Sequence, residues 1–165
     1  MIPQIKKILF ATDLSKNSAY AFYYAVHLAK RDEAKIVILH AVEPLPHMLV
    51  SFGDFERQVA KDRWEDTVKK FKERIEDISA KVDARTGISS VDFVSEILVR
   101  LGHPVEEILK VVDEEGCDVI VLGTHGKGFL EQTFLGSVSS SILLRTRKPV
   151  FIVPLPSKDI DNDLI

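Results

Sequence analysis

The sequence predicts an α/β fold built around a mostly parallel sheet. First, short apolar segments alternate with segments of helical period along the 165-residue chain. Second, the apolar segments, such as Lys35–Val42 and Val119–Leu122, are apolar at nearly every position rather than at every other one. A strand buried on both faces has this pattern, and the helices of a parallel sheet cover both faces. We therefore expect an open, three-layer structure with five strands and helices on both sides.

Length and composition narrow the class of protein. A chain of 165 residues fits one domain, expected at residues 1–156, and we expect the short acidic tail at 157–165 to be mobile. A formal net charge of −3 argues against a nucleic-acid partner held by bulk basic charge. The apolar runs are too short for a membrane span, and the first residues lack the pattern of a signal peptide. We expect a soluble cytoplasmic protein with neither a nucleic-acid nor a membrane partner.

The first βαβ unit is predicted from two apolar runs and the helix between them. Ile5–Ala11 is expected to form the first strand and Lys35–Val42 the second. The intervening helix continues to about Arg31, and either Ser15 or Ser18 can cap its start. Two parallel strands joined in this way have a right-handed crossover.

A long helix is predicted from about Asp54 to Val82. Apolar residues recur at alternating spacings of four and three, which places them on one stripe: Trp64, Val68, Phe71, Ile75, Ile78 and Val82. We interpret this stripe as packing against the sheet rather than as a coiled coil. The segment before it, Leu45–Phe55, is apolar without a period, which indicates either a cover over another part of the protein or a partner surface. Residues 83–90 are expected to form a loop.

The second half of the chain continues the alternation of strand and helix. The expected elements are a strand region at Val91–Arg100 with its best part from Val94 to Val99, a helix that begins at Gly102-His-Pro104 and stops at Gly116, a strand at Asp118–Leu122, a helix from Ser137 to about Arg145, and a strand at Val150–Val153. The single cysteine, Cys117, excludes an internal disulfide and is expected to be a small buried residue.

A glycine-rich loop follows the fourth predicted strand. Gly123, Gly126 and Gly128 have no side chain to cover the backbone, and Gly136-Ser137 marks the start of the next predicted helix. A buried strand, a bare loop and a helix start are the parts of a phosphate-binding site. The alternative is a tight turn that binds nothing. The spacing fits neither the Walker loop nor the GxGxxG pattern.

Ligands of open parallel sheets bind at the carboxyl ends of the strands, where the strand order reverses. Three such ends are candidates: Ala11-Thr12-Asp13, His40-Ala41-Val42 and Gly123-Thr-His-Gly126. They line one crevice if the first and fourth strands are neighbours. Ser137 and Ser139 could donate hydroxyl hydrogen bonds to phosphate. Asp13 could accept from ribose hydroxyls or help to hold a metal ion.

Histidines and catalytic patterns add little to this picture. His125 lies in the loop, where it either contacts phosphate or points to solvent. The other four histidines have no metal-ligand spacing and are interpreted as structural. No Ser-His-Asp or paired-carboxylate arrangement is recognisable.

Taken together, these motifs resemble the universal stress protein family of the UspA type. Gly123-x2-Gly126-x9-Gly136-Ser137 has the spacing of that family's ATP-binding motif. The further landmarks run in order along the chain from Ile5 to Pro154: Ile8-Leu-Phe-Ala-Thr-Asp13 with Ser18, Leu39-His-Ala-Val42, Gly102-His-Pro-Val-Glu-Glu-Ile108 and Lys148-Pro-Val-Phe-Ile-Val-Pro154.

The resemblance implies a Rossmann-like fold of the adenine nucleotide alpha hydrolase-like type that binds ATP, ADP or AMP, with Mg or Mn accompanying the nucleotide. By resemblance, Ala11, Thr12 and Asp13 flank the adenosine, with Asp13 toward the ribose, and the backbone of Ala41 faces the adenine. The phosphates would be held by Gly123, Thr124, His125, Gly126, Lys127, Gly128, Gly136, Ser137, Val138 and Ser139. The family also dimerises through its last strand, here Val150–Val153. Proline is frequent in the family where this chain has Ala11.

Three functions are compatible with the sequence. The first is a regulatory or signalling module of the stress response, in which the nucleotide changes Leu45–Phe55 and thereby a contact with a protein partner. The second is a slow ATPase or nucleotidyl transferase that stabilises charge with Lys127 and His125. The third is a structural homodimer without a ligand. Because no general base or nucleophile is recognisable, the first is preferred.

Overall fold

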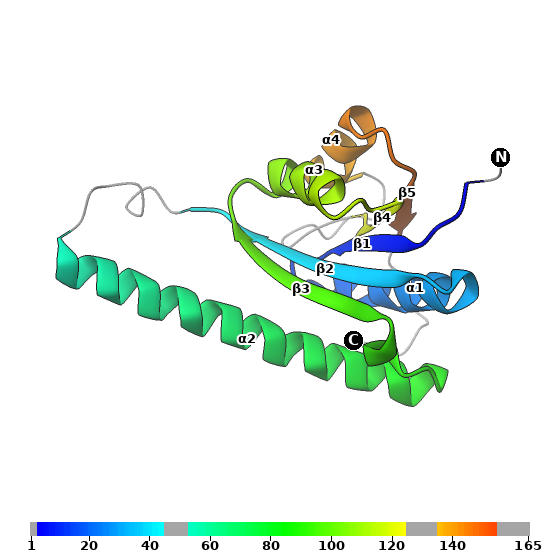
Figure 1. Cartoon of the computed structure of the whole chain (residues 1–165), viewed down its shortest axis with the longest axis horizontal. Coiled ribbons are helices and arrows are strands. Elements are labelled where there is room, and N and C mark those ends of the chain that lie inside the picture. Colours follow the sequence, from blue (N-terminus) through cyan, green and yellow to red (C-terminus); the bar gives the residue numbers. More distant parts are fainter. Residues whose placement is uncertain (1–2, 45–52, 125–134, 155–165) are drawn as a thin grey trace.

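The computed structural model describes residues 3–44, 53–124 and 135–154, and its centre is a five-stranded sheet (Figure 1). The strand order is β3-β2-β1-β4-β5, and all four neighbouring pairs are parallel. The strands are β1 (Lys7–Ala11), β2 (Lys35–Val42), β3 (Val94–Leu101), β4 (Val119–Gly123) and β5 (Val150–Val153). The predicted α/β class and the predicted count of five strands are confirmed.

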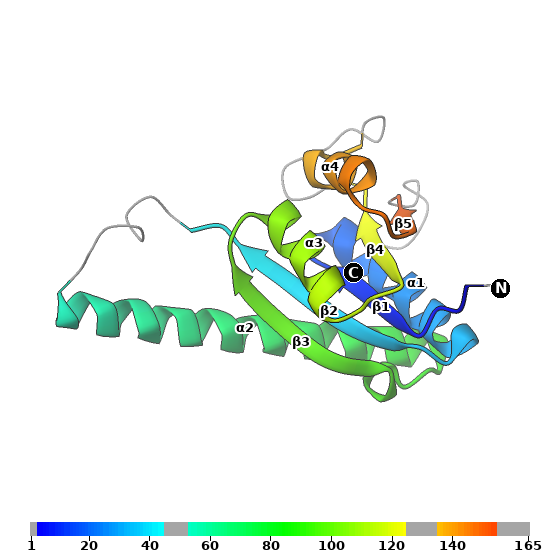
Figure 2. The same ribbon diagram turned by 45° about the horizontal axis from the view of Figure 1, so that its top comes forward.

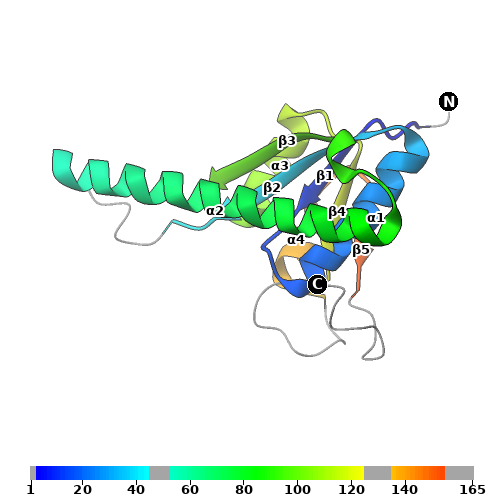
Figure 3. The same cartoon turned by 90° about the horizontal axis from the view of Figure 1, so that it is seen from below.

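Helices cover both faces of the sheet, as the apolar runs predict. The helices are α1 (Lys16–Asp32), α2 (Asp54–Thr86), α3 (Pro104–Glu114) and α4 (Ser137–Arg145). Figures 2 and 3 show α1 and α2 on one face and α3 and α4 on the other. Alternate residues of β1 enter two separate cores: Ile8 and Phe10 pack with α1 and α2, whereas Leu9 packs with α3 and α4. The same alternation holds in β2 and β4.

The first βαβ unit follows the predicted boundaries closely. Ser15 is the N-cap of α1, and its hydroxyl accepts a hydrogen bond from the Ser18 backbone N–H at 3.2 Å. Ser18 is instead a buried residue within the helix. The core between this helix and the sheet includes the rings of Phe10 and Phe22, whose centroids lie 5.1 Å apart.

Helix α2 is longer than predicted. It continues through residues 83–86, which were expected in a loop, because Ala84 and Arg85 favour helix and the first breaker is Gly87, which has φ +66. A short 3₁₀ turn at Ser90–Asp92 follows, so β3 begins at Val94, where the best part of the predicted strand region begins, and not at Val91. Val91 is exposed, which explains why its β-propensity does not decide its structure.

The apolar stripe of α2 is buried only in part. Phe71, Ile75, Ile78 and Val82 belong to the core, whereas Trp64 and Val68 are half-buried. Figures 1 and 3 explain this difference, because the N-terminal part of α2 extends beyond the sheet. Within the described ranges, none of the helices is both long enough and apolar enough to cross a membrane.

Cys117 is fully buried between α3 and β4, as predicted, and burial raises the pKa of its thiol from 9.0 to about 11. The folded-state pKa lies above the unfolded one, so the thiol's contribution to stability is complete below about pH 9 and is lost as the pH rises toward 11.

We therefore expect Cys117 to react with a thiol reagent at pH 8 about 100-fold more slowly in the folded than in the unfolded protein, because only opening exposes it. We also expect the unfolding free energy to fall more steeply between pH 9 and 11 in the parent protein than in Cys117→Ala. Urea titrations of both proteins across this range measure the difference. Equal slopes, or fast labelling of the folded protein, would contradict this description.

Candidate nucleotide-binding site

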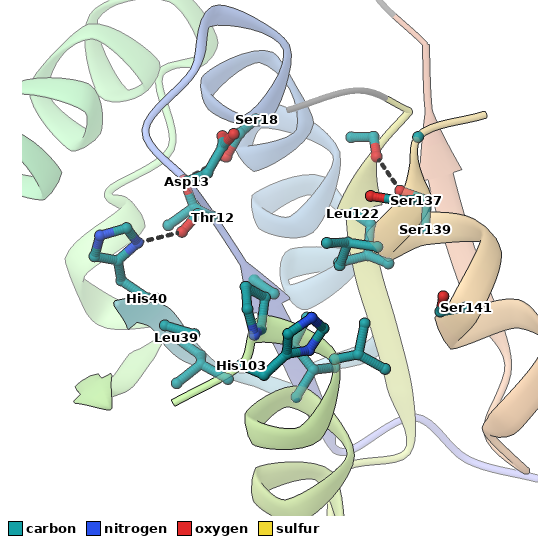
Figure 4. Close-up of a pocket in the computed structure, with 18 of the residues that line it drawn as sticks. Thr12, Asp13, Ser18, Leu39, His40, His103, Leu122, Ser137, Ser139 and Ser141 are labelled. Atoms are coloured by element: carbon teal, nitrogen blue, oxygen red, sulfur yellow. Dashed lines mark hydrogen bonds between the residues drawn. The ribbon is translucent and has the colours of Figure 1, made fainter. Parts of the chain in front are cut away.

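A cleft of about 590 Å³ opens at the carboxyl edge of the sheet (Figure 4). It lies between the neighbouring strands β1 and β4, where the strand order of the parallel sheet reverses. Its walls are formed by Ala11, Thr12, Asp13, Ser18, Leu39, His40, Ala41, Glu43, His103, Pro104, Val105, Ile108, Leu122, Gly123, Gly136, Ser137, Val138, Ser139 and Ser141. The strand ends proposed from the sequence therefore do line one crevice.

The turn after β1 is held by its own side chains. The Thr12 hydroxyl accepts from the Leu14 N–H at 3.0 Å, and the Asp13 carboxylate accepts from the Ser15 N–H at 2.9 Å. Ser18 donates its hydroxyl hydrogen bond to the Thr12 hydroxyl. Leu14 has φ 63, a left-handed conformation that a non-glycine residue adopts only when its surroundings enforce it. This turn presents Asp13 at the cleft in a fixed position.

The carboxyl end of β4 is joined to β5 and to the first turn of α1 by Asn17. This side chain is only 3% exposed; its amide donates to the Val153 carbonyl at 3.0 Å, and its oxygen accepts from the Thr124 hydroxyl at 3.2 Å. Gly123 lies directly against it, since a Cβ at Gly123 would be 2.7 Å from Asn17 Oδ1. The glycine at this position is therefore required by packing, and its φ is not in the left-handed region.

Helix α4 begins at the opposite wall of the cleft. Gly136 is its N-cap, no side chain of the described residues caps it, and the Gly136 N–H donates to the Thr124 carbonyl at 2.7 Å. The Ser139 hydroxyl donates to the Gly123 carbonyl at 2.8 Å, so Ser139 joins α4 to β4 in this structure. The first N–H groups of a helix find no acceptor within it. At the cleft wall these belong to Ser137, Val138 and Ser139.

The other end of the cleft is partly apolar and includes residues that sequence reasoning missed. Leu39 and Val105 are buried there, beside the exposed Glu43 and His103. The Glu43 carboxylate lies 3.7 Å from His103 Nε2. The candidates predicted from the sequence come from the ends of β1, β2 and β4 and do not include the end of β3, although the rule that parallel strands all end at the same edge of a sheet applies to β3 as well. That rule alone could have added His103 and Val105.

Some predicted site residues are placed by the structure and others are not described by it. Ala11, Thr12, Asp13, Ala41, Gly123 and Gly136–Ser139 all line the cleft. Thr124 adjoins it through its bonds to Asn17 and Gly136. His125, Gly126, Lys127 and Gly128 lie outside the described residues, as do most of Leu45–Phe55 and the tail at 157–165. Within the described ranges, no cluster of three or more His, Cys, Asp or Glu residues could hold a metal ion.

Two further contacts lie near the cleft: an ion pair between α3 and α4, and a ring stack between β2 and α2. Arg145 of α4 reaches Glu106 of α3 at 2.6 Å, and this hydrogen bond lowers the pKa of the Glu106 carboxyl. The contact links the two helices that cover the cleft side of the sheet. His40 lies flat against the ring of Phe71 of α2, with centroids 4.8 Å apart and planes at 9°.

The sequence has relatives of similar length. It is 27% identical over 162 residues to a universal stress protein of Methanocaldococcus jannaschii, covering 90% of this chain and 94% of that one. It is 32% identical over 148 residues to a universal stress protein of Thermus aquaticus, covering 90% and 98%.

Solved structures have the same fold. The universal stress protein UspA from Lactobacillus plantarum superposes with a TM-score of 0.72 at 20% identity, covering 92% of this chain and 99% of that one. A universal stress protein in complex with cAMP matches with a TM-score of 0.61 at 22% identity, covering 92% and 98%. One from Archaeoglobus fulgidus in complex with dAMP matches with a TM-score of 0.57 at 21% identity, covering 93% and 99%.

The family model is decisive, because it spans nearly the whole chain. The model described as the universal stress protein family matches residues 4–154. This range contains all five strands and every cleft residue named above. The chain therefore belongs to the universal stress protein family.

Proposed function

We propose that this protein binds an adenine nucleotide (ATP, ADP or AMP) in the cleft between β1 and β4 and serves as a regulatory module of the stress response. The observation that carries the proposal is a cleft at the point where the strand order reverses, with the N-terminus of α4 and its first backbone N–H groups in its wall. Helix N-termini favour phosphate. Two related structures, described as complexes with cAMP and dAMP, support an adenine nucleotide as the ligand.

The charges of the cleft favour one orientation of the ligand. Glu43 follows β2, which lies on the other side of β1 from β4, whereas the start of α4 is bonded to the end of β4; the negative charge of Glu43 would repel phosphates at its own end. The phosphates therefore belong at Ser137–Ser139 and the base beside Leu39, Ala41 and Val105. Asp13 lies between the two ends, where its carboxylate suits the ribose hydroxyls or a Mg or Mn ion that accompanies the phosphates.

Calorimetric titration of the intact chain tests the proposal. We expect ATP to bind with a Kd of about 1 mM or tighter, and GTP to bind more weakly because its base presents a different hydrogen-bonding edge. No measurable heat with ATP, ADP and AMP at millimolar concentration would refute it. The hydrolysis of ATP is a separate question from binding, and no observation on the described residues favours it over a regulatory role.

Ser137→Asp separates binding from folding. An acidic residue in the first turn complements the helix dipole, so we expect the melting temperature to be unchanged or raised. The same charge faces the proposed phosphates, so ATP should bind roughly tenfold or more weakly. Ser137→Ala is the control for loss of the hydroxyl without an added charge, and its affinity for ATP should lie between those of the parent and of Ser137→Asp. If Ser137→Asp binds ATP normally, the phosphates do not lie at this helix.

The last strand supports a homodimer as part of the same proposal. β5 is an edge strand of the sheet, and its Phe151 is 39% exposed beside Tyr24, with ring centroids 5.8 Å apart. An apolar edge needs cover, which a second copy can supply. Sedimentation equilibrium of the purified protein tests this, and a mass of one chain at micromolar concentration would contradict it. We also propose that the protein is located in the cytoplasm.

A further inference from the structure

The hydrogen-bond ladder between β1 and β2 ends at Leu39, although β2 itself continues to Val42. The pairing ends at Ala11 with Leu39, where the Thr12 N–H donates to the Leu39 carbonyl at 2.9 Å. In a parallel ladder, the next step would join the Thr12 carbonyl to the Ala41 N–H and the Leu14 N–H to the Ala41 carbonyl. Ala41 therefore points its backbone groups toward the side on which β1 has just ended.

Both groups of the β1 turn that could have paired with Ala41 are occupied by side chains. The Thr12 carbonyl lies 2.8 Å from His40 Nδ1, and the Leu14 N–H donates to the Thr12 hydroxyl at 3.0 Å. A carbonyl oxygen only accepts, so His40 Nδ1 must carry the proton of this bond. Figure 4 shows the His40 ring directed at Thr12.

The ring of His40 is fixed from its other side. It stacks on Phe71, which is buried on α2, with planes only 9° apart. A half-buried ring held by this hydrogen bond and by the stacked Phe71 ring has little freedom to rotate, so it occupies the Thr12 carbonyl persistently. The contact also links the base end of the cleft to the long helix.

We propose that His40 is a positioning residue: by holding the Thr12 carbonyl, it prevents the next ladder step and leaves the Ala41 N–H and carbonyl available to read the edge of a base. The pairing edge of adenine offers an acceptor beside an amino donor, which matches an N–H and a carbonyl of one residue. Hypoxanthine, with a carbonyl in place of the amino group, presents the reverse order. This inference rests on the proposed nucleotide site and deepens it.

Three variants test the assignment. His40→Leu removes the donor. His40→Asn restores an N–H at nearly the position of Nδ1. His27→Leu, at an exposed position on α1, is the matched control. In ligand-free protein, we expect the Ala41 amide to exchange with solvent at least about tenfold more slowly in His40→Leu than in the parent, because it then bonds to Thr12. His40→Asn and His27→Leu should resemble the parent.

Binding provides the second measurement. We expect His40→Leu to bind ATP roughly tenfold more weakly and to lose most of the preference for ATP over ITP, whereas His40→Asn keeps both within about threefold. A merely structural role would weaken both nucleotides alike and leave their ratio unchanged. The inference is overturned if Ala41 exchange is the same in His40→Leu as in the parent, or if His40→Asn fails as His40→Leu does. If the parent binds no nucleotide, the proposed function fails, and the exchange measurement still decides the role of His40.

Discussion

Gly123→Ala is expected to lower the free energy of unfolding by about 1–3 kcal/mol and to abolish measurable ATP binding. The new Cβ would lie 2.7 Å from Asn17 Oδ1, 2.9 Å from its Cγ and 3.3 Å from its backbone carbonyl carbon. Asn17 cannot move aside without losing its hydrogen bonds to Val153 and Thr124. The strain therefore spreads to the end of β4 and to the start of α4, which is bonded to it, and the cleft loses its shape.

Gly102→Ala is the matched control for this prediction. A Cβ at Gly102 would also come within 2.7 Å of a side-chain oxygen, here Glu107 Oε1. Glu107 has three rotatable side-chain bonds and can turn away, so we expect a cost below about 1 kcal/mol. Urea denaturation compares the two variants, and titration with ATP is done at a temperature where both are folded. Equal losses of stability would show that the contact with Asn17 does not constrain Gly123.

Asn17→Ala is expected to lower the free energy of unfolding by about 2–4 kcal/mol, because it removes one buried and one partly buried hydrogen bond and leaves a small cavity. The substitution removes the hydrogen bonds that join α1 to the carboxyl ends of β4 and β5, beside the cleft. ATP affinity should fall with it, since Gly123 is then no longer held.

Asn17→Asp makes the same prediction sharper. It keeps the acceptor for Thr124 but replaces the donor with a buried carboxylate that faces the Val153 carbonyl. Burial of an unpaired charge costs more than the loss of a neutral hydrogen bond. At pH 7 we expect the parent to be the most stable, Asn17→Ala to be less stable and Asn17→Asp to be the least stable, as measured by urea denaturation. An aspartate variant as stable as the parent would contradict the assigned hydrogen bonds.

Local patterns in the sequence were sufficient for the strands and for the faces of the helices. Ile8, Leu9 and Phe10 are all buried because the sheet is covered on both sides, and their unbroken apolar run predicted this. The end of α2 was predicted wrongly because its apolar stripe ends at Val82, whereas the backbone continues to the first residue that breaks a helix. An apolar stripe indicates which part of a helix is packed, and the helix can continue beyond the end of that stripe.

The site required information that local patterns do not carry. The Asn17 contact with Val153 joins residues 136 positions apart, and the His40 contact with Thr12 joins residues 28 apart. Both asparagine and histidine are ordinary on a helix or strand, so nothing in their neighbourhood marks them. The glycine spacing indicated where phosphates would bind, but the reason that Gly123 must be glycine, the closeness of Asn17, is a tertiary contact.

A crystal structure of the intact protein grown with ATP tests the central claim most directly. We predict density for one nucleotide in the cleft, with the base against the backbone of Ala41, the ribose beside Asp13 and the phosphates at the N–H groups of Ser137–Ser139. Density in the reverse orientation, density at another place on the surface, or a cleft without nucleotide at saturating ATP would contradict the assignment of this cleft as an adenine-nucleotide site.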